Sequence, residues 1–368
     1  MDKLFTPARV GAFDLSHRVV LAPLTRMRSD MPGNVPGPAM RDYYRQRATP
    51  GGLLVAEATF VSRQGNGGYA SPGMEDEAQL AGWRPVVEAV HEEGARFLLQ
   101  LWHVGRASHT ELQPGGAQPV APSGGESGAG VWLEHGYASA SPARAIHLTE
   151  IPGIVAQYRR AAERAQRAGF DGVEVHAANG YLIDQFLQDG SNTRTDAYGG
   201  SVENRMRFLL EVVDAVAEVW SADRIGVRIA PGGGFNDMHD SNAEALFTAV
   251  ARALMQRRIA YLHVVEPRVR GAGDPASQPP VASGMIKRAF GGPVIAAGAF
   301  DGSGAEAIVA AGDADLVAFG RPFIANPDLP ERLRLRLPLN AYDRDTFYYG
   351  GAAGYLDYPR YAALEPVA

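Results

Sequence analysis

Residues 294–320 have the sequence VIAAGAFDGSGAEAIVAAGDADLVAFG, in which two short apolar runs flank a segment with a helical pattern. The runs at residues 294–297 and 316–319 carry no charged side chain, as is typical of strands that are buried on both faces of a sheet. Residues 304–311 between them are a helix candidate. This stretch therefore predicts a strand, a helix and a second strand, which is the repeating unit of a parallel sheet.

The same alternation extends along the whole chain. Eight apolar runs that predict strands occur at residues 19–22, 53–58, 97–101, 172–175, 225–229, 261–265, 294–297 and 316–319. Amphipathic helix candidates lie between several of them, at residues 83–93, 154–168, 202–219, 242–257 and 304–311. Eight strand–helix alternations predict a fold of the α/β class, a closed (β/α)8 TIM barrel. An open nucleotide-binding sheet would place G-x-G-x-x-G directly after an early strand, and none of these runs is followed by it.

Charge and composition exclude several classes of function. The 368 residues carry 35 Lys and Arg against 41 Asp and Glu, without a long basic run, so we expect no nucleic-acid partner. Because the chain lacks a long uncharged apolar stretch and its first twenty residues are not apolar, we expect a cytoplasmic protein without a membrane partner. The absence of cysteine excludes disulfides, Cys-ligated zinc, iron–sulfur clusters and thiolate catalysis. Any redox chemistry therefore requires a bound cofactor.

The segment at residues 112–149, after the third predicted strand, is too long for an ordinary connection and is rich in glycine and proline. In a barrel it would lie at the mouth formed by the C-terminal ends of the strands, where it could fold over a ligand. An inert surface excursion explains the segment equally well.

Residues just beyond the C-terminal ends of barrel strands face the mouth, where active sites lie. These positions mostly carry uncharged or basic groups that form hydrogen bonds, which suggests an anionic ligand: Pro23, Leu24 and Thr25; Glu57, Ala58 and Thr59; Gln100, Trp102 and His103; His176, Asn179 and Tyr181; Arg228; Gly298; Gly320 and Arg321. The small residues after the last two strands would let main-chain N–H groups approach a phosphate, and Arg321 adds a positive charge. Glycine at a strand end is also ordinary turn chemistry.

The run HAANGY at residues 176–181 places two neutral hydrogen-bond donors and a phenol directly after a buried strand. His176 and Asn179 could polarise a carbonyl or nitro oxygen, and Tyr181 could deliver a proton. Without further context, a buried histidine, a turn residue and a packing tyrosine explain the same run. Arg228, on an apolar strand, needs an anionic partner, for which a ligand and a structural carboxylate such as Glu174 serve equally well.

Several motifs in chain order resemble those of the Old Yellow Enzyme family of FMN-dependent ene-reductases. They are LAPLTR at residues 21–26, QLWHVGR at 100–106, HAANGY at 176–181, YGGSVENR at 198–205, FGRPF at 319–323, ANPD at 325–328 and GYLDYP at 354–359. The resemblance runs from Leu4 to about Tyr361. It implies that residues 1–368 form a single barrel domain with FMN at its mouth and a β-hairpin at about residues 10–15 that closes the bottom.

The resemblance also implies roles for individual residues. Thr25 would bind the flavin near its C4 carbonyl, which places the chain in the threonine-bearing branch of the family. The other implied FMN contacts are Pro23, Leu24 and Ala58 against the ring, Gln100 and Arg228 at its pyrimidine edge, and Gly298, Ala299, Gly320 and Arg321 at the phosphate. Tyr69, Trp102 and Tyr348 would line the substrate pocket with His176, Asn179 and Tyr181, and no metal is expected.

The implied reaction begins with a hydride transfer from NADPH, with NADH as the other possibility, to the flavin. An α,β-unsaturated carbonyl compound or nitroalkene then binds with its oxygen between His176 and Asn179, accepts the hydride at its β-carbon, and is protonated at its α-carbon by Tyr181. The resemblance leaves both a monomer and a homodimer open. The sequence allows two other functions: a flavin-free barrel enzyme acting on a phosphorylated substrate, and a non-enzymatic flavin or steroid binder. The former would require a metal cluster or a lysine at a strand end, and the only lysines are Lys3 and Lys287.

Overall fold

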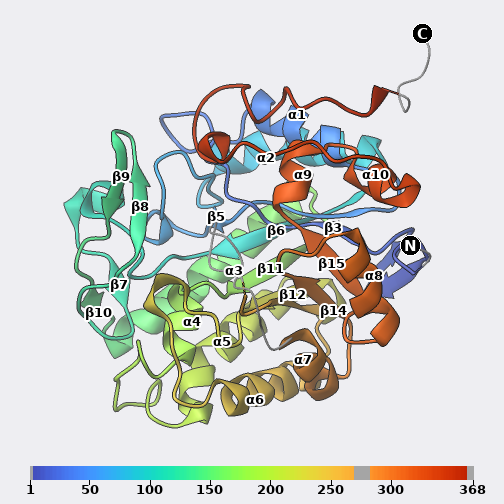
Figure 1. The fold of residues 1–368 in the computed structure, drawn as a ribbon. Coiled ribbons are helices and arrows are strands. Elements are labelled where there is room, and N and C mark those ends of the chain that lie inside the picture. Colours follow the sequence, from blue (N-terminus) through green and yellow to red (C-terminus); the bar gives the residue numbers. More distant parts are fainter. Residues whose placement is uncertain (1–2, 269–281, 363–368) are drawn as a thin grey trace.

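The barrel predicted from the sequence is present in the computed structural model, which describes residues 3–268 and 282–362. Its parallel strands are β3 (Val19–Leu21), β4 (Leu53–Val55), β6 (Arg96–Trp102), β11 (Gly172–Ala177), β12 (Ile225–Ile229), β13 (Tyr261–Val265), β14 (Val294–Ala297) and β15 (Leu316–Phe319). Each strand pairs with the next, and β15 pairs with β3, which closes the sheet into a barrel (Figure 1). The predicted (β/α)8 fold is confirmed.

The second predicted strand differs in detail from the observed one. The prediction covered residues 53–58, whereas β4 ends at Val55 and a short strand β5 (Thr59–Phe60) follows it. The chain advances four residues from Val55 to Thr59 while β6 advances three, from Leu98 to Leu101, so a β-bulge separates the two strands. The bulge brings Ala58 to the barrel mouth, where it lines the cavity described below.

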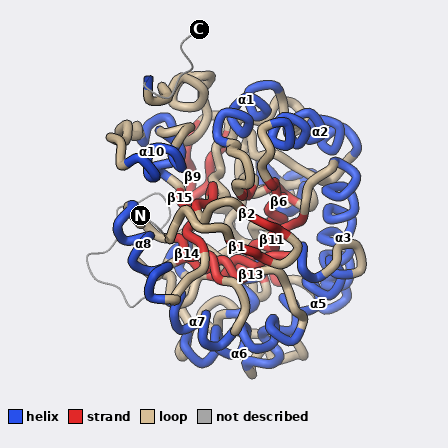
Figure 2. Tube along the Cα trace, turned by 90° about the vertical axis from the view of Figure 1, so that its right-hand side faces the viewer, coloured by secondary structure: helices blue, strands red, loops and turns tan. Residues whose placement is uncertain are grey.

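Helices surround the ring of strands, as Figure 2 shows. They are α1 (Pro38–Arg47), α2 (Glu77–Glu92), α3 (Ile151–Ala168), α4 (Leu182–Leu187), α5 (Val202–Ala217), α6 (Ala243–Gln256), α7 (Ala282–Phe290), α8 (Gly302–Ala311), α9 (Arg321–Ala325) and α10 (Leu329–Leu335). Helix α2 begins six residues before the predicted start, because Asp76 and Gln79 form a capping box at its N-terminus. Helices α1, α4, α7, α9 and α10 were not among the predicted ones.

A hairpin of β1 (Ala8–Val10) and β2 (Phe13–Leu15) lies at the N-terminal end of the barrel, near the centre of the ring in Figure 2. Its apolar residues Val10, Phe13 and Leu15 are buried in one cluster with inward residues of the barrel such as Leu98 and Ile295. Burial of these side chains closes the bottom of the barrel, so a ligand has access from the opposite end.

The long segment after β6 has secondary structure of its own. It contains β7 (Val120–Ala121), β8 (Gly130–Leu133), β9 (Gly136–Ser139) and β10 (Arg144–Ala145), of which β8 and β9 form an antiparallel hairpin. This hairpin stands at one side of the barrel, on the left in Figure 1. Within residues 3–268 and 282–362, none of the helices combines the length and apolar character that a membrane crossing requires.

Candidate active site

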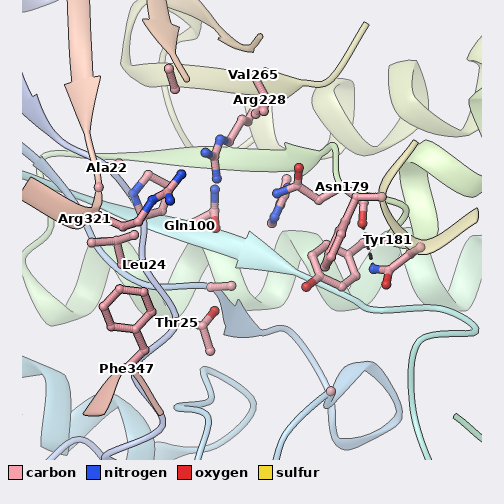
Figure 3. Close-up of a pocket in the computed structure, with 18 of the residues that line it drawn as sticks. Ala22, Leu24, Thr25, Gln100, Asn179, Tyr181, Arg228, Val265, Arg321 and Phe347 are labelled. Atoms are coloured by element: carbon pink, nitrogen blue, oxygen red, sulfur yellow. Dashed lines mark hydrogen bonds between the residues drawn. The ribbon is translucent and has the colours of Figure 1, made fainter. Parts of the chain in front are cut away.

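A cavity of about 630 Å³ opens at the C-terminal ends of the barrel strands. Its size lies in the range of small-molecule and cofactor sites. Most of the residues predicted from the sequence line it: Pro23, Leu24, Thr25, Ala58, Gln100, Trp102, His176, Asn179, Tyr181, Arg228, Gly298, Ala299, Gly320, Arg321 and Tyr348. Figure 3 shows Leu24 and Arg321 toward one end of the cavity, Asn179 and Tyr181 toward the other, and Gln100 and Arg228 between them.

Tyr69 is the one predicted substrate-pocket residue that the structure does not place on the cavity wall. Its main-chain N–H donates to the oxygen of Trp132, and its hydroxyl donates to Glu134 over 2.8 Å. These bonds hold Tyr69 against the β8–β9 hairpin. Of its neighbours, Gly67 reaches the cavity instead. Three of the strand-end residues expected at the mouth, Glu57, Thr59 and His103, do not line the cavity either and are buried.

His176 and Tyr181 form one wall with Trp102. The Tyr181 ring stands edge-on to His176, with centroids 5.1 Å apart, and edge-on to Trp102 at 5.2 Å. His176 Nδ1 is buried and has no hydrogen-bond partner among the described residues. Burial lowers the pKa of His176 well below its usual value, so the imidazole is neutral at neutral pH. Burial also raises the pKa of Tyr181, so its hydroxyl keeps its proton there.

A tight turn carries Asn179 to this wall. Asn179 and Gly180 both have positive φ, 59° and 71°, which Asn and Gly tolerate best. The Gly180 N–H donates to the Asp184 carboxylate over 2.8 Å, and the main-chain oxygen of Asn179 accepts a hydrogen bond from the Asn236 side chain over 2.9 Å. Asn179 is therefore a turn residue, and it also lines the cavity.

Arg228 lies at the middle of the cavity. It has no recorded hydrogen-bond partner among the described residues, and its Nε is buried. Burial lowers the pKa of its guanidinium, which the charge of Glu174 opposes. The carboxylate of Glu174 is hydrogen-bonded to Gln100, Tyr261 and His263 instead. A buried guanidinium with unused donors fits a ligand that offers hydrogen-bond acceptors or negative charge.

The end of the cavity beyond β14 and β15 has little side-chain bulk. Gly298 has a φ of +152°, and a Cβ atom there would lie 2.6 Å from Cβ of Glu266, so this position requires glycine. A Cβ atom on Gly320 would lie 3.0 Å from Cδ2 of Leu24. Gly298, Ala299, Gly320 and Arg321 all line this end of the cavity, and small residues beside a guanidinium suit a phosphate.

The roof of the cavity comes from loop segments that the positions of the strand ends did not predict. Gly128, Gly130, Trp132 and Tyr137 from the long excursion line the cavity, as do Phe235, Asn236 and Asp237 after β12 and Phe347 near the C-terminus. The Trp132 ring lies 5.6 Å from Tyr348, and Asp237 accepts a hydrogen bond from the Gly128 N–H. The length of the excursion was the only sequence signal for this roof. In the part of the chain that the structure describes, no group of three or more His, Asp or Glu side chains is placed to hold a metal ion.

Comparisons with known proteins agree with this geometry. The family model for the NADH:flavin oxidoreductase / NADH oxidase family matches residues 3–340. The putative 12-oxophytodienoate reductase 11 of Oryza sativa subsp. japonica is 48% identical over 358 residues, which covers 97% of both chains. The 12-oxophytodienoate reductase 2 of Arabidopsis thaliana is 46% identical over 368 residues, covering 99% of this chain and 96% of the relative.

Solved structures agree in fold as well. Morphinone reductase in complex with tetrahydroNAD has a TM-score of 0.91 and 49% identity, with 97% of each chain covered. The old yellow enzyme homologue from Zymomonas mobilis has a TM-score of 0.92 and 41% identity, with 97% of this chain and 99% of that chain covered.

Proposed function

Because the chain belongs to the NADH:flavin oxidoreductase / NADH oxidase family, the family of the Old Yellow Enzymes, we propose that it is an ene-reductase for α,β-unsaturated carbonyl compounds and nitroalkenes. Family membership itself makes it an FMN-type flavin oxidoreductase. The observation that carries the finer proposal is the cavity in which Arg228, with unused donors, lies beside a wall of His176, Asn179 and Tyr181.

The cavity residues fit FMN. Arg228 and Gln100 would bind the pyrimidine edge of the flavin, Thr25 would bind near its C4 carbonyl, and the region of Arg321 would bind the phosphate. The remaining contacts are Pro23, Leu24 and Ala58 against the ring and Gly298, Ala299 and Gly320 at the phosphate. Bound FMN supplies two-electron chemistry, in which hydride is taken from a nicotinamide and given to the alkene.

His176 and Asn179 would hold the substrate oxygen. Two donors aimed at one oxygen draw electron density from the conjugated alkene and stabilise the negative charge that develops on that oxygen. The β-carbon becomes electrophilic enough to accept a hydride. Because His176 is neutral, it acts as a hydrogen-bond donor and leaves the proton transfer to another group.

Tyr181 is that other group. Its raised pKa keeps the hydroxyl protonated at neutral pH, and its ring is held edge-on between His176 and Trp102. The hydroxyl would deliver a proton to the α-carbon, so that one hydride and one proton are added across the double bond.

A nicotinamide is the proposed reductant, and the resemblance favours NADPH. The tetrahydroNAD complex of the similar morphinone reductase is a reason to test NADH beside it. A single domain spanning residues 1–368, a monomeric or homodimeric state, a cytoplasmic location and the lack of a nucleic-acid partner stay predictions from the sequence.

The structure offers little to a flavin-free enzyme that would form a Schiff base. Lys287 donates to Asp315 over 2.6 Å from helix α7, and Lys3 lies near the N-terminus against Glu306. Neither lysine lines the cavity. The wall of His176, Asn179 and Tyr181 likewise favours an enzyme over a simple flavin or steroid binder, because binding alone does not need a placed proton donor.

The visible absorption spectrum of the purified protein tests the proposal. Anaerobic addition of NADPH, and of NADH in parallel, should bleach the flavin band, and cyclohexenone should then restore it. A protein that remains colourless after reconstitution with FMN would contradict the proposal. A flavin that is reduced but not reoxidised by cyclohexenone or by a nitroalkene would contradict the ene-reductase assignment alone.

A further inference from the structure

A buried hydrogen-bond network lies among the barrel strands, beside the cavity, with Glu174 at its centre. The Glu174 carboxylate accepts hydrogen bonds from Gln100 Nε2 over 2.7 Å, from the Tyr261 hydroxyl over 2.9 Å and from His263 Nδ1 over 2.9 Å. The exposed fraction of each of these four residues is 1% or less. Only Gln100 among them also lines the cavity.

The register of the barrel explains how these side chains meet. Glu174 on β11 is paired with Gln100 on β6 and with Gly226 on β12, and Gly226 is paired with Tyr261 on β13. A Cβ atom on Gly226 would lie 2.1 Å from Cζ of Tyr261. The missing side chain at residue 226 therefore lets the Tyr261 ring pass across β12 and reach Glu174.

The network carries one negative charge. Burial by itself raises the pKa of Glu174, but His263, Arg228 and the hydrogen bond from Gln100 outweigh it, and the net effect lowers the pKa. Burial lowers the pKa of His263, so its imidazole is neutral and its Nδ1–H donates to the carboxylate. Among the described carboxylates, Glu174 is the one whose charge raises the pKa of the Arg228 guanidinium against the effect of burial.

Two consequences follow for a ligand at the middle of the cavity. An ionised carboxylate only accepts hydrogen bonds, so Gln100 must present its NH2 group to Glu174. The amide oxygen of Gln100 is then available to accept a hydrogen bond from the ligand. Arg228, which shares no hydrogen bond with Glu174, keeps its donors for the ligand while its charge is partly balanced.

We propose that Glu174 is a positioning residue for the flavin. Its carboxylate fixes Gln100 as a hydrogen-bond acceptor, and its charge lowers the reduction potential of bound FMN. This inference rests on the proposed function. Uptake of two electrons and one proton gives the flavin a negative charge, which Arg228 stabilises and a neighbouring carboxylate opposes. Removal of the carboxylate charge should therefore favour the reduced flavin.

The midpoint potential of the Glu174→Gln holoenzyme, measured in an anaerobic dye-coupled titration, tests this directly. We expect the equilibrium to move toward reduced FMN by about tenfold, which for two electrons is a shift of about 30 mV to a more positive potential. Tyr158→Phe is the matched control, because Tyr158 is buried and its hydroxyl has no hydrogen-bond partner among residues 3–268 and 282–362. A potential equal to that of the control, or one more negative than in the wild type, would overturn the inference.

Tyr261→Phe provides a second test, which also applies if Glu174→Gln does not fold. This change removes one donor from Glu174 but keeps the carboxylate charge. The less compensated charge should oppose the reduced flavin more strongly, so we expect a several-fold shift toward oxidised FMN, opposite in sign to the effect of Glu174→Gln. A potential that matches Tyr158→Phe would count against a role of the network in the redox equilibrium.

The wild-type protein separates the two proposals. If it binds no FMN, the proposed function fails and the inference falls with it. If it binds FMN and reduces cyclohexenone while the variants leave the potential unchanged, only the inference about Glu174 fails.

Discussion

The Tyr349 hydroxyl donates a hydrogen bond to the main-chain oxygen of Leu133 over 2.9 Å, and it joins two segments that lie 216 residues apart in the chain. Leu133 ends strand β8, and Tyr349 follows Tyr348 of the cavity wall. The ring of Trp132 packs against both tyrosines, with centroids 5.6 Å from Tyr348 and 5.5 Å from Tyr349. The β8–β9 hairpin and the C-terminal segment thus form one roof over the cavity.

Loosening this roof should weaken substrate binding more than chemistry. Tyr349→Phe removes one hydrogen bond of about 1 kcal/mol, so we expect KM for cyclohexenone to rise about fivefold with kcat little changed. Steady-state kinetics at saturating reductant measure both constants, and Tyr158→Phe again serves as the control. A fall in kcat at constant KM would contradict a roof that acts on binding.

Tyr181→Phe should separate the two halves of the reaction. The phenylalanine ring keeps the packing against His176 and Trp102 but has no proton to deliver. We expect reoxidation of the flavin by cyclohexenone to slow by about 100-fold, while reduction by the nicotinamide keeps its rate. Anaerobic stopped-flow measurements follow the flavin in each half. An unchanged reoxidation rate would assign the proton to another donor.

Loss of the two side chains that donate hydrogen bonds to the enone oxygen should abolish recognition of that oxygen. His176→Ala and Asn179→Ala should each weaken cyclohexenone binding by about 10-fold or more, and the double variant further, because each donor is worth about 1.5 kcal/mol in a buried site. Spectral titration of the flavin measures the affinity. Equal affinities in the wild type and the double variant would exclude this pair as the oxygen-binding site.

The phosphate assignment of Arg321 is testable with a ligand that lacks the phosphate. Arg321→Ala should weaken FMN binding by about 10-fold or more, since a hydrogen bond to a charged group contributes about 1.5–3 kcal/mol. Riboflavin affinity should not change. Fluorescence of released flavin gives both dissociation constants, and Arg288→Ala, an exposed residue of helix α7, controls for the loss of charge. Equal weakening of riboflavin and FMN would place Arg321 elsewhere on the flavin.

Acid should destabilise the fold through His17. Its Nδ1 accepts the Val19 N–H over 3.3 Å and its Nε2 lies 3.0 Å from the Thr49 hydroxyl oxygen, while burial lowers its pKa from 6.5 to about 4. Below pH 6.5 the unfolded chain therefore binds a proton at His17, whereas His17 of the folded state stays unprotonated until the pH approaches 4. The resulting stability is intact at pH 7 and is lost as the pH falls toward 4.

At pH 5 this loss amounts to about 2 kcal/mol for His17. Urea unfolding at pH 7 and pH 5 should show that His17→Gln loses about 2 kcal/mol less over this range than the wild type. An identical pH dependence in the two proteins would show that His17 titrates alike in the folded and unfolded states.

The alternation seen in residues 294–320 was sufficient to predict the barrel, because a buried parallel strand needs an apolar run and its return connection needs a helix. The same alternation also predicted most of the residues that form the cavity wall. The C-terminal ends of parallel strands meet at one edge, so residues far apart in the chain, such as Thr25 and Arg228, come together without knowledge of any loop.

The positions of loop residues could not be predicted from the strand pattern. Tyr69 was expected in the substrate pocket, but it is hydrogen-bonded to Trp132 and Glu134 of the hairpin and does not line the cavity. Trp132 and Tyr137 line the cavity although no local pattern marks them. Their positions depend on long-range pairing between the excursion and the C-terminal segment, which a periodic pattern does not encode.

The sequence by itself determined the barrel, the order of its strands and the residue types at the mouth, because these depend on hydrophobic period and on short connections. It left open whether Glu174 or a ligand partners Arg228. In the tertiary structure Arg228 makes no recorded hydrogen bond to Glu174, whose carboxylate accepts hydrogen bonds from Gln100, Tyr261 and His263, so the donors of Arg228 remain available to a ligand. Hydrogen-bond satisfaction inside the barrel depends on the register of four strands and on the open space at Gly226, and such three-dimensional relationships arise only when the barrel closes.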